Sequence, residues 1–137
     1  DYIISAEVVR REPLNVEIFN KKFKIIKVSL NDYLDEINAN KTVIWGAGHQ
    51  ALTVISLSNI KKKISYIVDS ATFKQNKYTP ESHLLINKPD FMLKDKPESI
   101  IVMAAGFSDE IVKIINTKYP FIQNIAVLRE DNLEIIK

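Results

Sequence analysis

Apolar runs and amphipathic segments alternate along most of the chain. Short apolar runs between turn residues are typical of buried strands, whereas apolar positions three or four residues apart are typical of helices. The pattern predicts strands at residues 43–46, 64–69, 99–105, 124–128 and 133–137, and helices at 29–37, 49–57, 89–93 and 109–119. Residues 70–88 have no clear period and are predicted to form a long ordered loop, which is usually a functional feature in a compact domain.

The first part of the chain has a different pattern. β-prone apolar runs occupy residues 3–9, 15–19 and 23–28, so we expect short strands or a hairpin there, with Ser29 capping the first helix. Residues 1–28 are therefore predicted to be N-terminal strands or a connecting segment, and residues 29–137 to be the main domain. The chain starts at Asp1 and not at methionine, which favours a fragment cut from a longer protein.

Alternating strands and helices predict an α/β fold with a mainly parallel sheet and helices on both of its faces. We expect a small Rossmann-like, doubly wound domain with the strand order 3-2-1-4 and an antiparallel or extra edge strand. Ligands of such sheets lie at the carboxyl ends of the strands, where the strand order reverses. The expected crevice lies between the turn at residues 46–50 and the turn at residues 106–109.

Composition excludes several classes of function. A chain of 137 residues is about the size of one domain, and its net charge of +2 comes from lysines scattered among acids, so no basic stripe marks a nucleic-acid partner. The absence of cysteine excludes disulfides, thiolate zinc sites and a thiol nucleophile, and two histidines are too few for a histidine-rich metal site. We find no membrane span and no signal peptide, and predict a cytoplasmic protein.

A glycine-rich turn is the first candidate site. Gly46, Gly48 and Ala51 have the G-x-G-x-x-A spacing after a predicted strand, and Asp69 ends the next strand where a ribose-binding acid belongs. The turn recognises a phosphate or carboxylate generically. The predicted cofactor-binding residues are Gly46, Gly48, His49, Gln50 and Asp69. Two alternatives stay open: the glycines can serve the turn alone, and Asp69 can cap a loop.

Three segments resemble a known family. VIWGAGHQALT, YIVDSATFKQNKYTPESHLLI and PESIIVMAAGFSDEI are similar to the C-terminal domain of sugar C-methyltransferases, over about residues 40–128. The element KQxKYTPxxH is more specific than the glycine turn. Asn76 stands where the family pattern has glycine, Glu81 and Ser82 replace Gly-Thr, and Phe107 replaces tyrosine. Residues 1–28 match no part of this pattern.

The resemblance implies a three-part enzyme. A zinc-binding N-terminal region and a central methyltransferase domain would precede this chain, and a nucleotide-linked sugar would lie between the central and C-terminal domains. S-adenosylmethionine and the catalytic base would belong to the central domain, so we assign no catalytic residue, metal or cofactor to this chain. The substrate-binding residues implied by the specific element are Lys74, Gln75, Lys77, Tyr78, Thr79 and His83.

Each feature also has a structural interpretation, and three functions stay open. The favoured one is a substrate-side domain that positions a nucleotide-sugar for the methyltransferase domain of the same parent chain. The second is a stand-alone NAD-binding or nucleotide-binding domain. The third is a non-catalytic interaction domain with a degenerate pocket, and the sequence leaves homo-oligomerisation open. No residue offers itself for hydride chemistry, which weakens the second function.

Overall fold

The computed structural model describes the backbone of residues 2–137 and the side chains from residue 20 onward. Its helices are α1 (Tyr2–Ile37), α2 (His49–Ser58), α3 (Phe91–Asp95) and α4 (Ser108–Lys118). Its strands are β1 (Thr42–Trp45), β2 (Tyr66–Val68), β3 (Lys77–Tyr78), β4 (Leu85–Asn87), β5 (Ser99–Val102), β6 (Asn124–Leu128) and β7 (Leu133–Ile135). Short 3₁₀ turns follow α2, β2 and β5, at η1 (Lys61–Lys63), η2 (Thr72–Lys74) and η3 (Ala105–Phe107).

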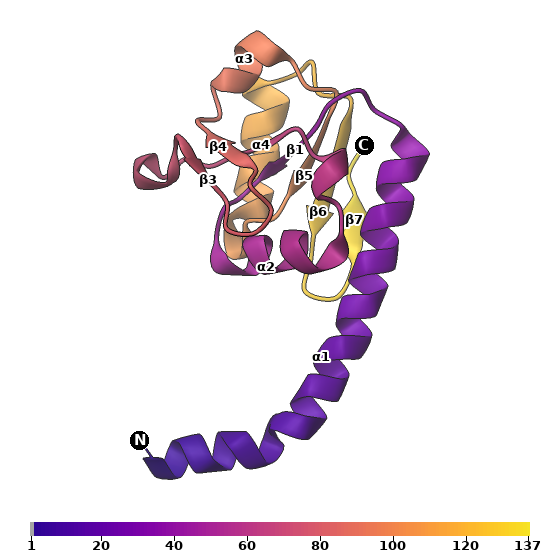
Figure 1. Ribbon diagram of the computed structural model, residues 1–137. Coiled ribbons are helices and arrows are strands. Elements are labelled where there is room, and N and C mark those ends of the chain that lie inside the picture. The colour runs from indigo at the N-terminus through magenta and orange to yellow at the C-terminus, as the bar shows by residue number, and fades with distance from the viewer. Residues whose placement is uncertain (1) are drawn as a thin grey trace.

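The strands form one mixed sheet in the order β3-β4-β2-β1-β5-β6-β7 (Figure 1). The five inner strands are parallel, while β3 and β7 pair antiparallel at the two edges. The register places Ile44 of β1 between Ile67 of β2 and Ile101 of β5. The structure confirms the predicted α/β Rossmann-like class and the antiparallel edges.

Alternate strand residues face opposite sides of the sheet, and each side has its own core. Ile44, Ile67 and Ile101 belong to the core that α1 and α2 cover. Val43, Ile100 and their neighbours belong to the core that includes Met92 of α3 and Ile115 of α4. Helices therefore lie on both faces, which explains why the central strands are apolar at nearly every position.

The prediction of strands within residues 2–28 is wrong, because α1 runs without interruption from Tyr2 to Ile37. Ser29 lies inside this helix and does not cap it. Among the described side chains, Ile26, Leu30, Tyr33 and Leu34 are buried and form one stripe at helical spacing. The stripe crosses the expected boundary at residue 28, so Ile26 continues the helical pattern and does not end a strand. The division of the chain into residues 1–28 and 29–137 stays a prediction.

The predicted loop at residues 70–88 is only partly a loop. It contains η2 and the antiparallel pair β3 and β4, and β4 joins the sheet next to β2. Counted along the predicted strands, the expected order 3-2-1-4 is wrong, because the third of them, β5, pairs with β1 and not with β2. The place beside β2 is taken by β4, a strand that the sequence pattern does not reveal. A three-residue strand is too short for a clear period of two, and parallel pairing with β2 supplies its hydrogen bonds.

Candidate functional site

A cleft of about 650 Å³ lies at the carboxyl ends of the central strands. Residues from the segments 45–51 and 69–74 form one side, and residues from the segments 103–107 and 110–114 form the other. The cleft therefore lies at the predicted switch point, where β1 has β2 on one side and β5 on the other.

The two glycines of the turn have different roles. Gly46 has a φ of 130°, and a Cβ atom placed on it would lie 2.2 Å from the carbonyl oxygen of Met103. Only glycine fits this close approach between β1 and β5. Gly48 has an ordinary φ of −76°, and no atom lies within 4 Å of an added Cβ. Gly46 is therefore required by the fold, whereas Gly48 faces open space in the cleft.

The start of α2 lines one side of the cleft. The first backbone bond of the helix joins the amide of Leu52 to the carbonyl of Gly48 at 3.0 Å, and no side chain caps this end. Because the first amides of a helix have no partner within it, the amides of His49, Gln50 and Ala51 remain available for a ligand. The side chains of His49 and Gln50 are exposed and line the cleft.

Asp69 lies directly after β2 and contacts the glycine turn. Its Oδ2 atom accepts a hydrogen bond from the amide of Ala47 at 2.8 Å, and its Oδ1 atom accepts one from the amide of Ala71 at 2.8 Å. Its side chain is only 15% exposed. Asp69 therefore does cap a loop, which is the structural alternative that the sequence left open, while it also lines the cleft.

Lys74 and Gln75 lie at the cleft end of the segment that precedes β3. Lys74 lines the cleft, with its Nζ atom 3.9 Å from Oδ2 of Asp69 and 5.7 Å from the centre of the Phe73 ring. Gln75 donates from Nε2 to the carbonyl oxygen of Asp69 at 2.8 Å. Lys74 brings a positive charge to the cleft, and Gln75 fixes the segment that carries it.

The other predicted substrate residues lie away from the cleft. Because β3 runs antiparallel to β4, the chain leaves the carboxyl ends of the strands after Gln75 and passes through Lys77 and Tyr78, both exposed on the edge strand. It reaches the amino ends at Thr79 and His83. Thr79 is buried, with Oγ1 bonded to Ser82 Oγ at 2.5 Å and accepting from the amide of Leu84 at 2.9 Å.

The backbone of His83 takes part in the turn between β3 and β4, and its side chain is exposed. Its φ is 53°, and its amide donates to the carbonyl of Thr79 at 3.1 Å. Near it, Ser56 of α2 donates to Glu81 at 2.5 Å. These contacts hold the turn between β3 and β4 against the C-terminal half of α2. The six residues implied by the specific element therefore do not gather at one site.

An apolar wall of the cleft was missed by the sequence analysis. Phe107 of η3 is 69% exposed and Ile114 of α4 is 44% exposed, and both line the cleft together with Ile111. Ile115, the next residue of α4, is by contrast fully buried. Phe107, unlike Trp45 and Tyr66, is not a core residue.

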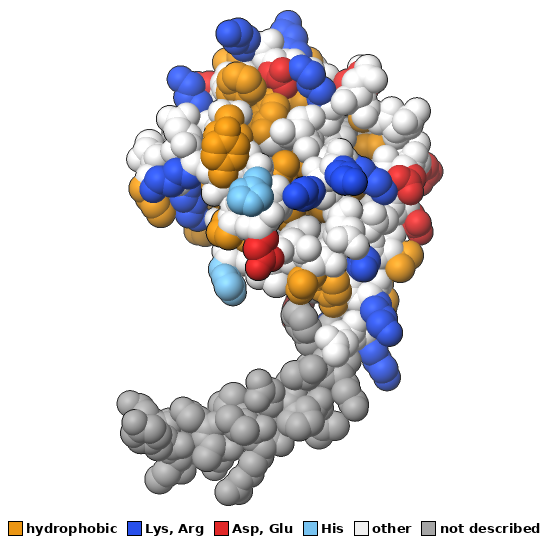
Figure 2. Space-filling view, in the orientation of Figure 1, with side chains coloured by type: hydrophobic (Ala, Val, Ile, Leu, Met, Phe, Trp, Pro, Cys, Tyr) orange, Lys and Arg blue, Asp and Glu red, His pale blue; other side chains and the backbone are white. Residues whose placement is uncertain are grey.

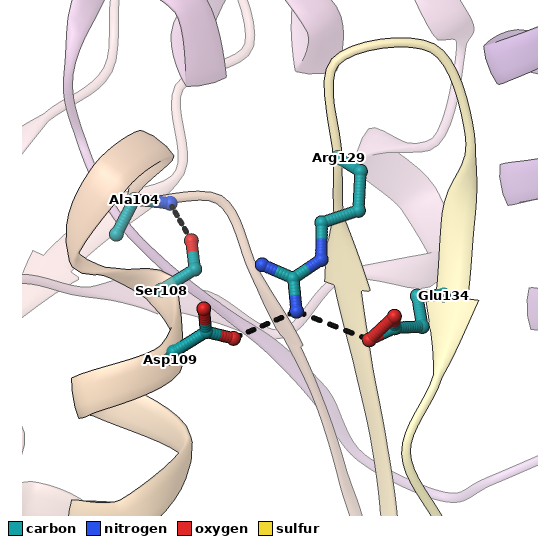
Figure 3. A network of polar contacts seen from close by, with 5 residues as sticks. All are labelled: Ala104, Ser108, Asp109, Arg129 and Glu134. Carbon is teal, nitrogen blue, oxygen red and sulfur yellow. Dashed lines mark hydrogen bonds and ion pairs between the residues drawn. The ribbon is translucent and has the colours of Figure 1, made fainter.

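Polar contacts fix the start of α4, on the far side of the cleft (Figure 3). Ser108 does not cap the helix: its Oγ atom accepts from the amide of Ala104 at 3.2 Å. Arg129, after β6, donates to Asp109 at 2.7 Å and to Glu134 of β7 at 3.0 Å. These two hydrogen bonds raise the pKa of Arg129. The network ties α4 to the sheet edge and so holds η3 in place.

Tyr66 and Tyr119 are core residues whose hydroxyl groups each donate a hydrogen bond to an aspartate. The pKa of Tyr66 is raised far above its ordinary value, mainly by burial and to a smaller extent by the hydrogen bond to Asp95 at 2.9 Å. Burial, followed by the hydrogen bond to Asp90 at 2.8 Å, does the same for Tyr119. Both phenols therefore stay neutral donors, and Trp45 packs edge-on against Tyr119. Trp45 lines the cleft, but only 4% of its surface is exposed.

The described part of the chain contains no group of three or more His, Asp or Glu side chains arranged to hold a metal ion. Within the same part, no helix has both the length and the apolar character that crossing a bilayer requires. Lysine and arginine side chains are dispersed over the face of the domain in Figure 2, between acidic and apolar ones.

Comparisons with solved structures agree with the fold. UDP-D-quinovosamine 4-dehydrogenase from Vibrio fischeri is similar over 71% of this chain and 93% of its own, with 17% identity and a TM-score of 0.50. RSP, a Rex-family repressor, is similar over 90% of this chain and 79% of its own, with 13% identity and a TM-score of 0.51. At such identities the likeness shows the fold alone. No protein of curated function matches the sequence.

A family comparison is more specific. The sequence matches the model described as the C-methyltransferase C-terminal domain over residues 7–123. The match begins far upstream of residue 40, so it includes most of α1, for which the sequence analysis found no resemblance. This match confirms the predicted family over most of the sequence. The chain belongs to the C-methyltransferase C-terminal domain family.

Proposed function

We propose that this domain binds a nucleotide-linked sugar through its diphosphate and positions the sugar for methyl transfer by another domain of the parent protein. The observation that carries the proposal is the open space over Gly48, where a phosphate can approach the backbone without meeting a side chain. The free amides at the start of α2 point to the same place.

Charge and shape support a diphosphate at this position. Lys74 is held 3.9 Å from Asp69, which is longer than a hydrogen bond, so its ammonium group can turn toward an anion in the cleft. The helix dipole of α2 adds a partial positive charge at its first turn. Across the cleft, Phe107, Ile111 and Ile114 present an apolar surface that suits a base or a deoxygenated sugar face.

The residues of this chain do not fit S-adenosylmethionine. A methyl-donor turn of the common type has an acid two residues before its first glycine, and here that position is Ile44, which is fully buried in the core. Methyl transfer is therefore assigned to a domain outside this chain. The contribution of this domain is orientation, which converts a bimolecular reaction into one between prepositioned groups.

A calorimetric titration with matched variants tests the proposal. UDP, dTDP and ADP are titrated into the domain beside NAD and S-adenosylmethionine. We expect a nucleoside diphosphate to bind and S-adenosylmethionine not to bind. Lys74→Ala should weaken binding about tenfold because it removes the charge that lines the cleft. Lys77→Ala is the matched control on the edge strand and should change affinity less than about twofold.

Two results would contradict the proposal. Equal losses for Lys74→Ala and Lys77→Ala would place the ligand on the edge strand and not in the cleft. Tight binding of NAD without binding of any nucleoside diphosphate would favour a dinucleotide-binding domain.

A further inference from the structure

Asp69 joins two separate backbone segments through one carboxylate. One oxygen accepts from Ala47 in the glycine turn at 2.8 Å, and the other accepts from Ala71 after β2 at 2.8 Å. Both bonds join a neutral donor to a charged acceptor, which makes them stronger than ordinary backbone bonds. The carboxylate therefore has a partner at each oxygen before any ligand arrives.

The backbone of Asp69 is held as firmly as its side chain. Its amide donates to the carbonyl of Asn87 in β4 at 3.1 Å, and its carbonyl accepts from Gln75 Nε2 at 2.8 Å. The carboxylate cannot turn toward a ribose hydroxyl without releasing Ala47, which is itself buried. An unpaired amide at a buried position is costly, so the turn favours the bonded arrangement.

We propose that Asp69 is a positioning residue that holds the glycine turn open for a phosphate, and that it does not recognise the ribose. This inference rests on the proposed function. It predicts that the cleft recognises its nucleotide through the phosphates. Ribose and 2′-deoxyribose forms of one nucleoside diphosphate should therefore bind with similar affinity.

Removal of the Asp69 charge has opposite expected effects, depending on whether the carboxylate mainly repels a phosphate or mainly holds the glycine turn. A carboxylate beside a diphosphate repels it, so Coulomb's law alone predicts that Asp69→Asn tightens phosphate binding. The amides of Ala47 and Ala71 bond different oxygens of Asp69, and asparagine has an NH₂ group in place of one of them, which cannot accept a hydrogen bond. If Asp69 holds the turn, the substitution frees one amide, and phosphate binding becomes weaker in spite of the lost repulsion.

Glu110 provides a matched control. It is an exposed carboxylate of α4 that lines the same cleft on the opposite side from the glycine turn. Glu110→Gln removes the same charge and leaves the turn untouched. Any difference in sign between the two variants therefore reports the bonds that Asp69 makes with the turn.

The experiment titrates inorganic pyrophosphate, UDP and dUDP into the wild-type domain, Asp69→Asn and Glu110→Gln. We expect Asp69→Asn to weaken all three ligands by a similar factor of about ten. Glu110→Gln should leave them unchanged or tighten them by up to about threefold. The ratio of UDP to dUDP affinity should stay near one in all three proteins.

Two outcomes would overturn the inference while leaving the proposed function intact. One is a wild-type preference for UDP over dUDP of about tenfold or more, because a site that bonds a hydroxyl rejects the analogue without it. The other is tighter pyrophosphate binding in Asp69→Asn, as in Glu110→Gln. The comparison of UDP with dUDP in the wild type needs no variant, so it decides even if Asp69→Asn does not fold.

Failure of the proposed function would look different, because the wild type would bind none of the three ligands. The positioning role would fall with it. Amide exchange at Ala47, slow in the wild type and faster in Asp69→Asn, would then show that the carboxylate only stabilises the turn.

Discussion

The carboxyl and amino ends of the parallel strands differ in how their backbone groups are bonded. At the carboxyl ends, Gly48 faces open space and the first amides of α2 have no side-chain cap. At the amino ends, the turn from Thr79 to Leu84 is closed by its own hydrogen bonds and packed on α2. Both regions belong to the segments that resemble sugar C-methyltransferases. The difference supports the proposal that a ligand binds at the carboxyl ends, while the amino ends serve the fold.

The largest expected effect is a difference in unfolding free energy between alanine substitutions of the two glycines in the cleft turn. Gly46→Ala should cost about 4 kcal/mol or more of unfolding free energy, because its Cβ would overlap the backbone of Met103 at a positive φ. Gly48→Ala should cost less than about 1 kcal/mol, since its φ is ordinary and its surroundings are empty. Urea unfolding measures both.

Gly48→Ala should nevertheless weaken nucleoside diphosphate binding, because its methyl group would enter the space assigned to a phosphate. Retained affinity in a folded Gly48→Ala domain would show that the ligand does not approach the backbone there. A mild effect of Gly46→Ala on stability would show that β1 and β5 can separate at this point.

A smaller effect is expected from the buried hydroxyl at the other end of the sheet. Thr79→Val keeps the shape of the side chain but leaves the amide of Leu84 without its acceptor, while the hydroxyl of Ser82 keeps only a long bond to the carbonyl of Pro80 at 3.4 Å. The expected loss is about 2 kcal/mol of unfolding free energy, with unchanged nucleotide affinity. Thr117→Val, at an exposed threonine of α4, is the control and should change stability by less than about 0.5 kcal/mol. Weaker binding by a folded Thr79→Val domain would return Thr79 to the substrate site.

The smallest effect concerns Glu81, which has a φ of 61° where the resembled pattern has glycine. Glu81→Gly should stabilise the domain by about 0.5 kcal/mol, because relief of the left-handed strain exceeds the loss of an exposed bond to Ser56. Glu81→Ala keeps the strain and loses the bond, so it should be neutral or slightly destabilising. Thermal unfolding of both variants isolates the strain, and equal melting temperatures would mean that the turn carries none.

Asn76, at the start of the hairpin, also has a positive φ, but with less strain than Glu81. It also replaces a glycine of the resembled pattern and has a φ of 63°. Asparagine tolerates the left-handed region better than other residues, since its short polar side chain can bond locally. The two departures from the family pattern therefore both lie at a positive φ, at different conformational cost.

Local sequence patterns determined a large part of the fold. The strands β1, β5 and β6 and the helices α2 and α4 follow directly from apolar runs and periods, because each is buried along a whole face. The spacing of Gly46, Gly48 and Ala51 placed the turn, and the alternation of elements placed the crevice at the carboxyl ends. The family was also readable from the sequence, because its motifs are specific.

Only the tertiary structure decided which candidate residues share a site. Lys74 and Thr79 are five positions apart, yet one lines the cleft and the other is buried near the opposite end of the sheet, because β3 carries the chain from one end to the other. The same holds for α1, whose apolar stripe is buried in the core next to α2, and for β4, which pairs with β2. Whether Asp69 faces a ligand or the turn depends on the amides of Ala47 and Ala71, and their positions follow from packing between strands that are distant in sequence.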